Sequence, residues 1–474
     1  MMIEFALLFL DGLHKELLFF ASICFLLGSI DDTIFDALWI GHKLKRKLFV
    51  YPKHQRATVE SLTFSSKSEA LAVFVPAWQE ADVIGAMLQR CLRQWTYTYY
   101  RIYVGCYPND PATIAAVAAA VGGSDKVRLV VCEEHGPTSK ADCLNRLWKA
   151  LCKDEIVESK TYGAIILHDA EDIVHPEALK LFGHLTGRAS LVQIPVIPRR
   201  ALKSRWIAGH YGDEFAELHA KQMVLREALG VSLPSAGVGC AFARSALARV
   251  SIRTRGKPFD AASMTEDYEL GLKLTGAGGR GIFARLKDRQ GQLVATQEFF
   301  PDNLDDAVRQ KARWMAGIAL MGWDRLGWKS CWRENWMRLR DRKASFAAII
   351  LALAYAAIVL TGLLWICSAA GFYQMQPIST SLKIMLSANV IFLAWRLAIK
   401  SYFVFSLYGF REALLSVPRT LVANIINIMA ARLALAQYIG SLSGTPIRWD
   451  KTSHFYPELS EIQQLKTATQ SSRE

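Results

Sequence analysis

The chain has 474 residues, of which 52% are hydrophobic and 13 are tryptophan, and its formal net charge is +13. It is long enough for more than one structural unit and too apolar for an ordinary soluble enzyme of this size. No RNA- or DNA-binding motif is present, and the basic residues stand beside apolar runs and tryptophans, so the charge favours anionic lipid over nucleic acid. The nine cysteines form no C-x-x-C pair, which indicates a reduced compartment without a disulfide framework.

The first apolar segment runs from Leu17 to Ile40. Aspartates interrupt its second half at three positions: Asp31, Asp32 and Asp36. A membrane span there would need these acids near a surface or inside a protein contact. The segment lacks the basic start and the A-x-A site of a cleaved signal peptide. The basic run from His42 to Lys47 places the following domain in the cytoplasm, so residues 1–48 are expected to form a membrane helix and its flank.

Apolar strands alternate with helical segments from about residue 68 to about residue 284. The expected strands are LAVFVPA, RIYVGCY, VRLVVC, AIILHD and LVQIPVI, and helices are expected at 82–94, 113–121 and 140–152. This alternation is typical of an α/β fold with a doubly wound parallel sheet, whose ligands lie at the C-terminal ends of the strands. We expect this domain to occupy residues 49–300.

Residues 301–343 become helical in pattern, with Trp328, Trp332 and Trp336 on one face. This segment could pack over the domain core, but the membrane segment that follows favours a helix in the lipid interface.

Apolar segments from Ser345 to Ala370 and from Leu382 to Tyr408 are each long enough to span a bilayer. Arg396 and Lys400, in the second span, could snorkel to headgroups or line a polar path. Residues 411–438 fit either a third span or an interfacial helix. We therefore expect transmembrane or interfacial helices over 344–442 and a cytoplasmic tail over 443–474.

The stretch from Tyr162 to Pro176, YGAIILHDAEDIVHP, ends an apolar strand on the carboxylates Asp169, Glu171 and Asp172. In extended backbone Asp169 and Glu171 point to the same side, where they could hold a hard divalent cation. Mg²⁺ bound in this way usually also holds substrate phosphates. The alternative is a solvated acidic turn.

Three further motifs could contact a nucleotide. In VPAWQEADVI a base or ribose could lie against Pro76 and Ala77, with Glu80 in the turn. In GCYPNDPAT, Asp110 could accept a hydrogen bond from a uracil imide or only cap a helix. GPTSKADCLN places Lys140 at a helix start, where a cation suits a diphosphate, although a surface lysine is equally consistent.

The next two motifs could carry the reaction. In SMTEDYELGLKL, Ser263 and Glu266 form a capping box, and Asp267 beside them is a candidate general base whose pKa neighbouring acids would raise. In RQKARWMAG one helix face carries three candidates, Gln310, Arg313 and Trp314. Arg313 could neutralise a leaving diphosphate, while the other two could contact sugar. The small residues of SAGVGCAFAR allow either a close backbone approach or a tight turn.

Taken in order, VPAWQEADVI, KADCLN, HDAED, TEDYELGLKL and QKARW resemble the membrane family 2 glycosyltransferases, the inverting group that includes cellulose, chitin and hyaluronan synthases. Within that family, GPTSKADCLN, LHDAEDIVHP, TEDYELGLKL and WDKTSH (Trp449 to His454) look most like the catalytic part of the phage-adsorption B type. The resemblance implies a GT-A-type nucleotide-sugar-binding domain inserted between transmembrane helices. It also implies a UDP-sugar donor and Mg²⁺ or Mn²⁺.

The resemblance also assigns roles to residues. Asp169 and Glu171 match the D-x-D metal pair, although Glu171 is one methylene longer than the usual aspartate. Asp267, with Glu266 beside it, matches the catalytic T-E-D motif. The substrate-binding set is Pro76, Ala77, Glu80, Asp110, Lys140, Asn145, Gln310, Arg313 and Trp314. The sequence W-Q-E stands where Y-N-E is usual, at the expected nucleobase contact.

The implied function is an inverting glycosyltransferase of the bacterial inner membrane that extends a β-linked polysaccharide processively and passes it outward. One alternative is a non-processive glycosyltransferase that acts on a lipid acceptor. Another is a non-catalytic phage-receptor or surface-assembly component. Expected partners are a UDP-sugar, a polysaccharide or lipid acceptor and membrane lipid. Because the sequence stops soon after WDKTSH, any regulation is expected to come from a partner protein. An outer-membrane export protein is a further candidate partner.

Overall fold

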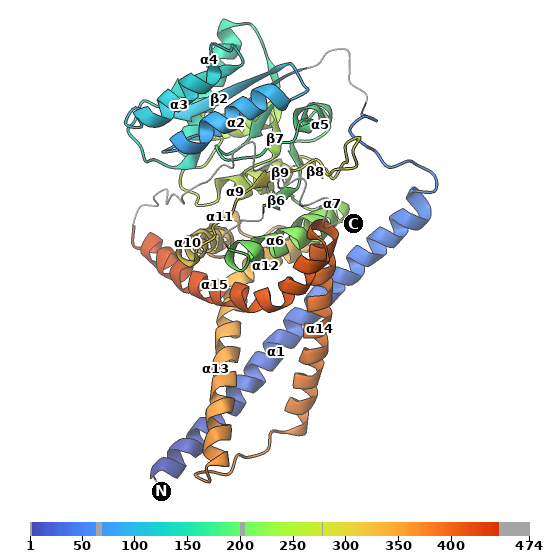
Figure 1. The fold of residues 1–474 in the computed structure, drawn as a ribbon, viewed down its shortest axis with the longest axis vertical. Helices are drawn as coiled ribbons and strands as arrows, with labels where there is room; N and C mark the ends of the chain where they lie inside the picture. The colour runs from blue at the N-terminus through green and yellow to red at the C-terminus, as the bar shows by residue number, and fades with distance from the viewer. Residues whose placement is uncertain (1, 63–68, 200–203, 277, 445–474) are drawn as a thin grey trace.

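The structure, a computed structural model, describes residues 2–62, 69–199, 204–276 and 278–444. The WDKTSH motif and nearly all of the expected tail lie outside the described residues. An α/β domain lies at one end of the molecule, and long helices extend from it to the other end (Figure 1). The domain is built on a seven-stranded sheet of order β3-β2-β1-β4-β7-β5-β8.

The strands of this sheet are β1 (Ala70–Pro76), β2 (Tyr100–Cys106), β3 (Val127–Val131), β4 (Tyr162–Leu167), β5 (Leu191–Gln193), β7 (Cys240–Ala243) and β8 (Gly281–Phe283). The first four pair in parallel, as predicted. The prediction of a wholly parallel sheet is wrong for β7, which runs antiparallel to both β4 and β5.

The expected strand LVQIPVI is two strands in two sheets. β5 ends at Gln193, and β6 (Val196–Pro198) pairs with β9 (Thr296–Glu298) in a separate sheet. Pro195 lies between them and has no N–H to continue a ladder. The buried Gln193 amide fixes the break by donating to the carbonyls of Ile194 and Val238 at 2.8 and 2.9 Å.

Helices cover both faces of the central sheet, which is why its strands are apolar on both sides. One core joins Val73 and Val75 to α2 (Ala81–Gln94), α3 (Pro111–Val121) and α5 (Ala178–Leu185). The opposite core joins Ala72 and Phe74 to α4 (Lys140–Val157), α8 (Arg244–Arg253) and α9 (Glu266–Gly276). The three predicted helices of this region are confirmed, and α4 extends five residues further than expected.

Shorter helices lie between the domain and the long helices. They are α6 (Ile207–Glu217), the π-helix η2 (Leu218–Gln222), α7 (Met223–Ala228), α10 (Leu304–Trp314), the π-helix η3 (Met315–Met321), α11 (Gly322–Leu326) and α12 (Trp332–Arg342).

The expectation of three tryptophans on one helix face is wrong for Trp328. The chain leaves α11 at Gly327, whose φ of +54° favours glycine. Trp328 therefore lies in the loop before α12, edge-on against Trp323, with the guanidinium of Arg342 4.7 Å from its ring.

Four described helices are long and apolar enough to cross a membrane: α1 (Met2–Lys45), α13 (Ala344–Ala369), α14 (Thr380–Tyr408) and α15 (Phe410–Leu442). The π-helix η1 (Arg46–Val50) follows α1. In Figure 1, α1, α13 and α14 extend away from the domain, whereas α15 runs across beneath it. Apolar side chains are exposed along one face of α15, including Leu414, Leu421 and Ile425. This arrangement favours an interfacial helix, the second of the two alternatives for this segment.

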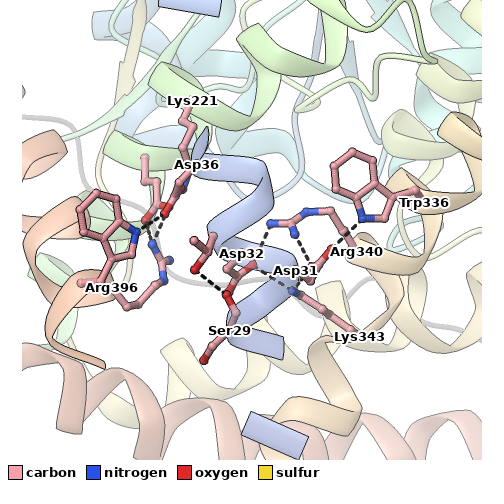
Figure 2. A network of polar contacts seen from close by, with 12 residues as sticks. Ser29, Asp31, Asp32, Asp36, Lys221, Trp336, Arg340, Lys343 and Arg396 are labelled. Carbon is pink, nitrogen blue, oxygen red and sulfur yellow. Dashed lines mark hydrogen bonds and ion pairs between the residues drawn. The ribbon is translucent and has the colours of Figure 1, made fainter. Parts of the chain in front are cut away.

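The aspartates of α1 lie inside a protein contact, which is the second of the two alternatives for these acids (Figure 2). Asp31 and Asp32 both pair with Arg340 and Lys343 at the junction of α12 and α13. Asp36 is buried and accepts hydrogen bonds from Lys221 of η2 and from Trp395 of α14, the latter at 3.0 Å.

The acids of α6 pair with bases from the helices below. Glu217 accepts from Arg396 of α14 at 2.6 Å. Asp213 pairs with Arg419 of α15 at 2.7 Å and lies 3.8 Å from Lys400. Arg396 and Lys400 thus meet protein acids, and both line a cavity described below. Ion pairs of this kind offset the cost of keeping charges out of water.

Candidate functional site

Strands β2, β1 and β4 are parallel neighbours, so the segments that follow them meet at one edge of the sheet. Pro76 and Ala77 are buried at the end of β1, and the N–H of Ala77 donates to Gly105 at 2.8 Å. Glu80 follows, with its own N–H bonded to the hydroxyl of Thr113 at 2.9 Å. These residues therefore lie at the C-terminal edge of the parallel strands, and a nucleotide contact by them stays a prediction.

Asp110 caps helix α3. One carboxylate oxygen accepts from the N–H of Thr113 at 3.3 Å and the other from the N–H of Gln79 at 2.5 Å. Asp110 is therefore a helix cap, which is one of the two alternatives for this residue. A nucleotide contact by Asp110 stays a prediction.

Trp78 packs into the domain. Its ring lies edge-on against Tyr107, and a Cβ on Gly136 would come within 2.6 Å of it. Asn109 holds Gly136 in place with hydrogen bonds to its N–H and its carbonyl, each 2.8 Å long.

The acidic motif lies on a turn. β4 ends at Leu167, and Asp172 closes the turn by donating its N–H to the carbonyl of Asp169 at 3.2 Å. The extended backbone expected for Asp169 and Glu171 is therefore wrong. The fully buried Asp172 carboxylate accepts from the ring of His168 at 2.5 Å and from the N–H of Asp169 at 3.3 Å. Burial lowers the pKa of His168 to about 4, so its ring is neutral.

Lys140 and Asp169 lie together. Lys140 opens α4 immediately after the capping residue Ser139, and its Nζ is 2.5 Å from a carboxylate oxygen of Asp169. Burial disfavours the charged amine, but Asp169, Glu266 and Asp267 hold the pKa of Lys140 above its ordinary value. The charged amine of Lys140 therefore lies close to these three carboxylates.

Helix α9 begins at Glu266, and Asp267 lies in its first turn. Burial, then the neighbouring Asp267, raises the pKa of Glu266 to about 7. Burial also raises the pKa of Asp267, against the opposing effect of Lys140. A base with a raised pKa suits proton abstraction near neutral pH.

The capping box is not formed. The hydroxyl of Ser263 donates to Glu269 at 2.6 Å and accepts from the N–H of Thr265 at 3.2 Å, so it does not cap α9 through Glu266. Glu269 is almost fully buried, and this contact satisfies one of its oxygens.

Two glycines allow close approach to the T-E-D segment. Gly237 has a φ of +78°, and a Cβ there would overlap the carboxylate of Asp267. A Cβ on Gly317, in η3, would come within 2.6 Å of the hydroxyl of Thr265. The small residues of SAGVGCAFAR thus let the carboxylate of Asp267, the candidate base, come close to their backbone.

Gln310, Arg313 and Trp314 all lie on α10, as predicted. Trp314 packs edge-on against Tyr211, with ring centroids 6.0 Å apart. The amide oxygen of Gln310 is buried without a hydrogen-bond partner among the described residues. Within the same part of the chain, no hydrogen bond or ion pair engages the guanidinium of Arg313. Polar groups left open in this way are available to a ligand.

One cavity of about 1440 Å³ borders several of these groups, although Gln310, Asp169 and Glu171 are not among its lining residues. Its upper part is lined by Lys140, Glu266, Asp267, Arg313 and Trp314. It continues among α1, α13, α14 and α15, where Ser22, Asp36, Asn389, Arg396 and Asn424 line it. Polar side chains between helices of membrane-spanning length are consistent with a substrate path.

Asn145 lies apart from this set. Its amide donates to the carbonyl of Phe259 at 2.7 Å and accepts from the N–H of Phe259 at 3.0 Å. The structure thus shows Asn145 joining α4 to the segment before α9.

Asp169 and Glu171 have the donor chemistry for Mg²⁺ or Mn²⁺. Among the described residues no group of three or more His, Cys, Asp or Glu side chains is arranged to hold a metal ion by itself. However, Mg²⁺ commonly takes only one or two carboxylates and completes its shell with water and substrate phosphates. The surplus of negative charge around Lys140 fits such a cation.

Glu298 belongs to this acidic group and was not found from the sequence. Burial, then Asp172, Glu171 and Asp169, raise its pKa well above the ordinary value. It ends the short strand β9, which has no motif of its own, so only the fold brings it here.

Comparison with known proteins agrees with this arrangement. Residues 69–317 match the model of the family described as "Glycosyltransferase like family 2". The chain belongs to this family. The match begins just before β1 and ends in η3, so it contains every candidate site residue.

The full chain resembles two curated relatives. It is 36% identical over 472 residues to "Bacteriophage adsorption protein B" of Escherichia coli (strain K12) and equally to "Bacteriophage N4 adsorption protein B" of Escherichia coli O157:H7. The alignment covers 95% of this chain and 63% of each relative. The family resemblance seen in the motifs is therefore confirmed, although the chain spans under two thirds of these relatives.

Among solved structures, the mannosyltransferase PcManGT from Pyrobaculum calidifontis, in complex with GDP-Man and Mn²⁺, has the same fold. The two share 15% identity with a TM-score of 0.54, over 89% of this chain and 99% of that one. The predicted GT-A fold with apolar helices is confirmed.

Proposed function

We propose that the chain transfers a sugar from a UDP-sugar to the end of a growing β-linked polysaccharide, with inversion, at the cytoplasmic face of the bacterial inner membrane. The observation that carries this proposal is the continuous cavity, which joins Asp267, Lys140 and Arg313 to the helices that would cross the membrane. An acceptor that occupies the membrane part of the cavity ends beside Asp267.

In the proposed reaction the acceptor hydroxyl attacks the anomeric carbon in line with the departing UDP. The bond from the acceptor oxygen to that carbon forms as the bond to the diphosphate breaks, and the hydroxyl proton passes to Asp267. In this proposal Arg313 and Lys140 bind the diphosphate, and Gln310 and Trp314 orient the sugar. Asp169 and Glu171 would hold Mg²⁺ or Mn²⁺, which supplies further positive charge against the diphosphate.

A lipid acceptor is the second candidate. The membrane part of the cavity also has apolar walls, including Leu18, Phe25, Ile358 and Val390. Such walls suit an acyl or polyprenyl chain as well as they suit surrounding lipid. Product length separates this candidate from a processive synthase.

The test uses full-length protein in lipid nanodiscs, a panel of radiolabelled UDP-sugars and GDP-mannose, and Mg²⁺ or Mn²⁺, with the products sized. Asp267→Asn should lower transfer by about 10²- to 10⁴-fold because it removes the proton acceptor. Asp125→Asn, in an exposed loop before β3, is the matched control and should retain full activity. The catalytic role is refuted if no donor is turned over and Asp267→Asn keeps its cellular role.

A further inference from the structure

Three consecutive residues of α12, Arg340, Asp341 and Arg342, each hold a different part of the molecule. The central one, Asp341, accepts a hydrogen bond from the hydroxyl of Tyr268 at 2.5 Å and from Arg226 at 2.6 Å. Tyr268 directly follows Asp267 in α9. Asp341 therefore reaches the candidate base through one intervening residue.

Tyr268 fixes the orientation of α9. Successive side chains leave a helix about 100° apart, so Tyr268 and Asp267 point in different directions from the same turn. Both residues border the cavity, but the buried Tyr268 side chain reaches Asp341 of α12 with its hydroxyl. A rotation of α9 about its axis, or a shift along it, would move both side chains together. The hydrogen bond from Tyr268 to Asp341 opposes such a movement.

Helix α12 is itself held from two sides. Arg340 pairs with Asp31 and Asp32 of the long helix α1 (Figure 2). Arg342 donates to the carbonyls of Gly322 and Gly327, at 2.6 and 2.8 Å, at the two ends of α11. Because α11 follows η3, which follows Trp314, this second contact leads to the helix that carries Arg313. Asp341 thus lies on an element fixed to both the membrane helix and the Q-x-x-R-W helix.

We infer that Asp341 is a positioning residue for sugar transfer: through Tyr268 it sets where the Asp267 carboxylate stands relative to Arg313. This inference rests on the proposed function, in which Asp267 is the base. Asp341 also borders the cavity, but one of its carboxylate oxygens is already engaged by Tyr268 and Arg226, so its proposed effect passes through Tyr268. Its loss should lower the rate of the chemical step and leave donor binding nearly unchanged, because Lys140, Arg313 and Asp169 stay in place.

The test compares Tyr268→Phe, Asp341→Asn and the double variant as full-length protein in lipid nanodiscs. Each variant removes a hydrogen bond to a charged carboxylate that favours the orientation of α9 in which Asp267 is aligned. Without that bond the aligned orientation is less populated, and kcat should fall by about tenfold or more. Each single variant should show that fall, with the donor KM within about twofold of wild type. The double variant should be no slower than the slower single variant, because both changes break the same bond.

Tyr373→Phe is the matched control. It breaks a hydrogen bond of the same chemistry, from Tyr373 to Asp11 at 2.9 Å, and should leave kcat unchanged, because the connection between α13 and α14 lies at the end of these helices away from the domain (Figure 1). Tyr268→Phe decides the question if Asp341→Asn does not fold, because it removes a single oxygen.

The inference is overturned if Tyr268→Phe keeps the wild-type kcat, if the donor KM rises instead, or if Tyr373→Phe shows an equal loss. Asp267→Asn, measured beside these variants, distinguishes a failure of the proposed function from a failure of the positioning role. An active Asp267→Asn removes the proposed base. An inactive Asp267→Asn with normal Tyr268→Phe and Asp341→Asn removes only the positioning role.

Discussion

Replacing Gly237 with alanine should impair the candidate base without touching it chemically. Gly237 has a φ of +78°, and the three atoms nearest to an added Cβ all belong to Asp267. Ordinary contact begins near 3.4 Å, so the carboxylate would have to move by about 1 Å, a misplacement that can lower a rate by about 100-fold. The left-handed backbone adds a cost of about 1–2 kcal/mol in stability.

Gly256→Ala is the control for the backbone cost alone. Gly256 has a φ of +87°, and an added Cβ there has no atom within 4 Å. Both variants should lose similar thermal stability, but only Gly237→Ala should lose kcat. Turnover of radiolabelled donor and a melting curve for each variant measure the two effects separately. If kcat for Gly237→Ala lies within about twofold of that for Gly256→Ala, the reasoning about the base is wrong.

Two further predictions concern stability. The folded protein raises the pKa of Glu266 from 4.5 to about 7, so it holds a proton that the unfolded chain releases, and this stabilising contribution is lost as pH rises between those values. Glu266→Gln should therefore raise the melting temperature relative to wild type more at pH 8 than at pH 5, and an equal effect at both would contradict the assignment. Replacing Asp31 and Asp32 together with asparagine should lower the melting temperature by several degrees, because Arg340 and Lys343 lose their partners in a partly buried contact. Glu133→Gln, which removes the ion pairs of an exposed carboxylate with Lys149 and Arg146, should change the melting temperature little, and similar shifts in both proteins would refute the claim.

The sequence predicted the parts of the domain whose signal is local. Strands β1 to β4 are apolar runs of five to seven residues bounded by turn residues, and α2 and α3 begin at recognisable turns. Strands β7, β8 and β9 have three or four residues, and their partners are distant in the chain. Pairing of this kind is decided by tertiary context, which is why these strands and the antiparallel β7 were missed.

The residues of the candidate site also fall into those with a local sequence signal and those that only tertiary contacts reveal. Lys140, Asp267 and Arg313 stand in motifs whose order along the chain resembles a known family, and the fold brings them to one cavity. Glu298 and Asp341 stand in segments without such motifs, and their neighbours come from other elements. A prediction made within one motif was also wrong. Ser263 pairs with Glu269, one helical turn beyond Glu266, the partner that the capping box predicts.

The ion pairs of α6 affect how the protein can be divided. A shortened chain that ended before α13 would keep Asp213 and Glu217 but lose Arg419, Lys400 and Arg396. Asp213 would then lose Arg419 and Lys400 as counter-charges, and Glu217 would keep only Lys221, although both acids are now shielded from water. We expect such a fragment to be poorly soluble and easily proteolysed, even though its central sheet would be intact. The membrane helices are therefore part of the folding unit rather than a removable anchor. A helix grafted from a relative would need to bring matching basic residues with it.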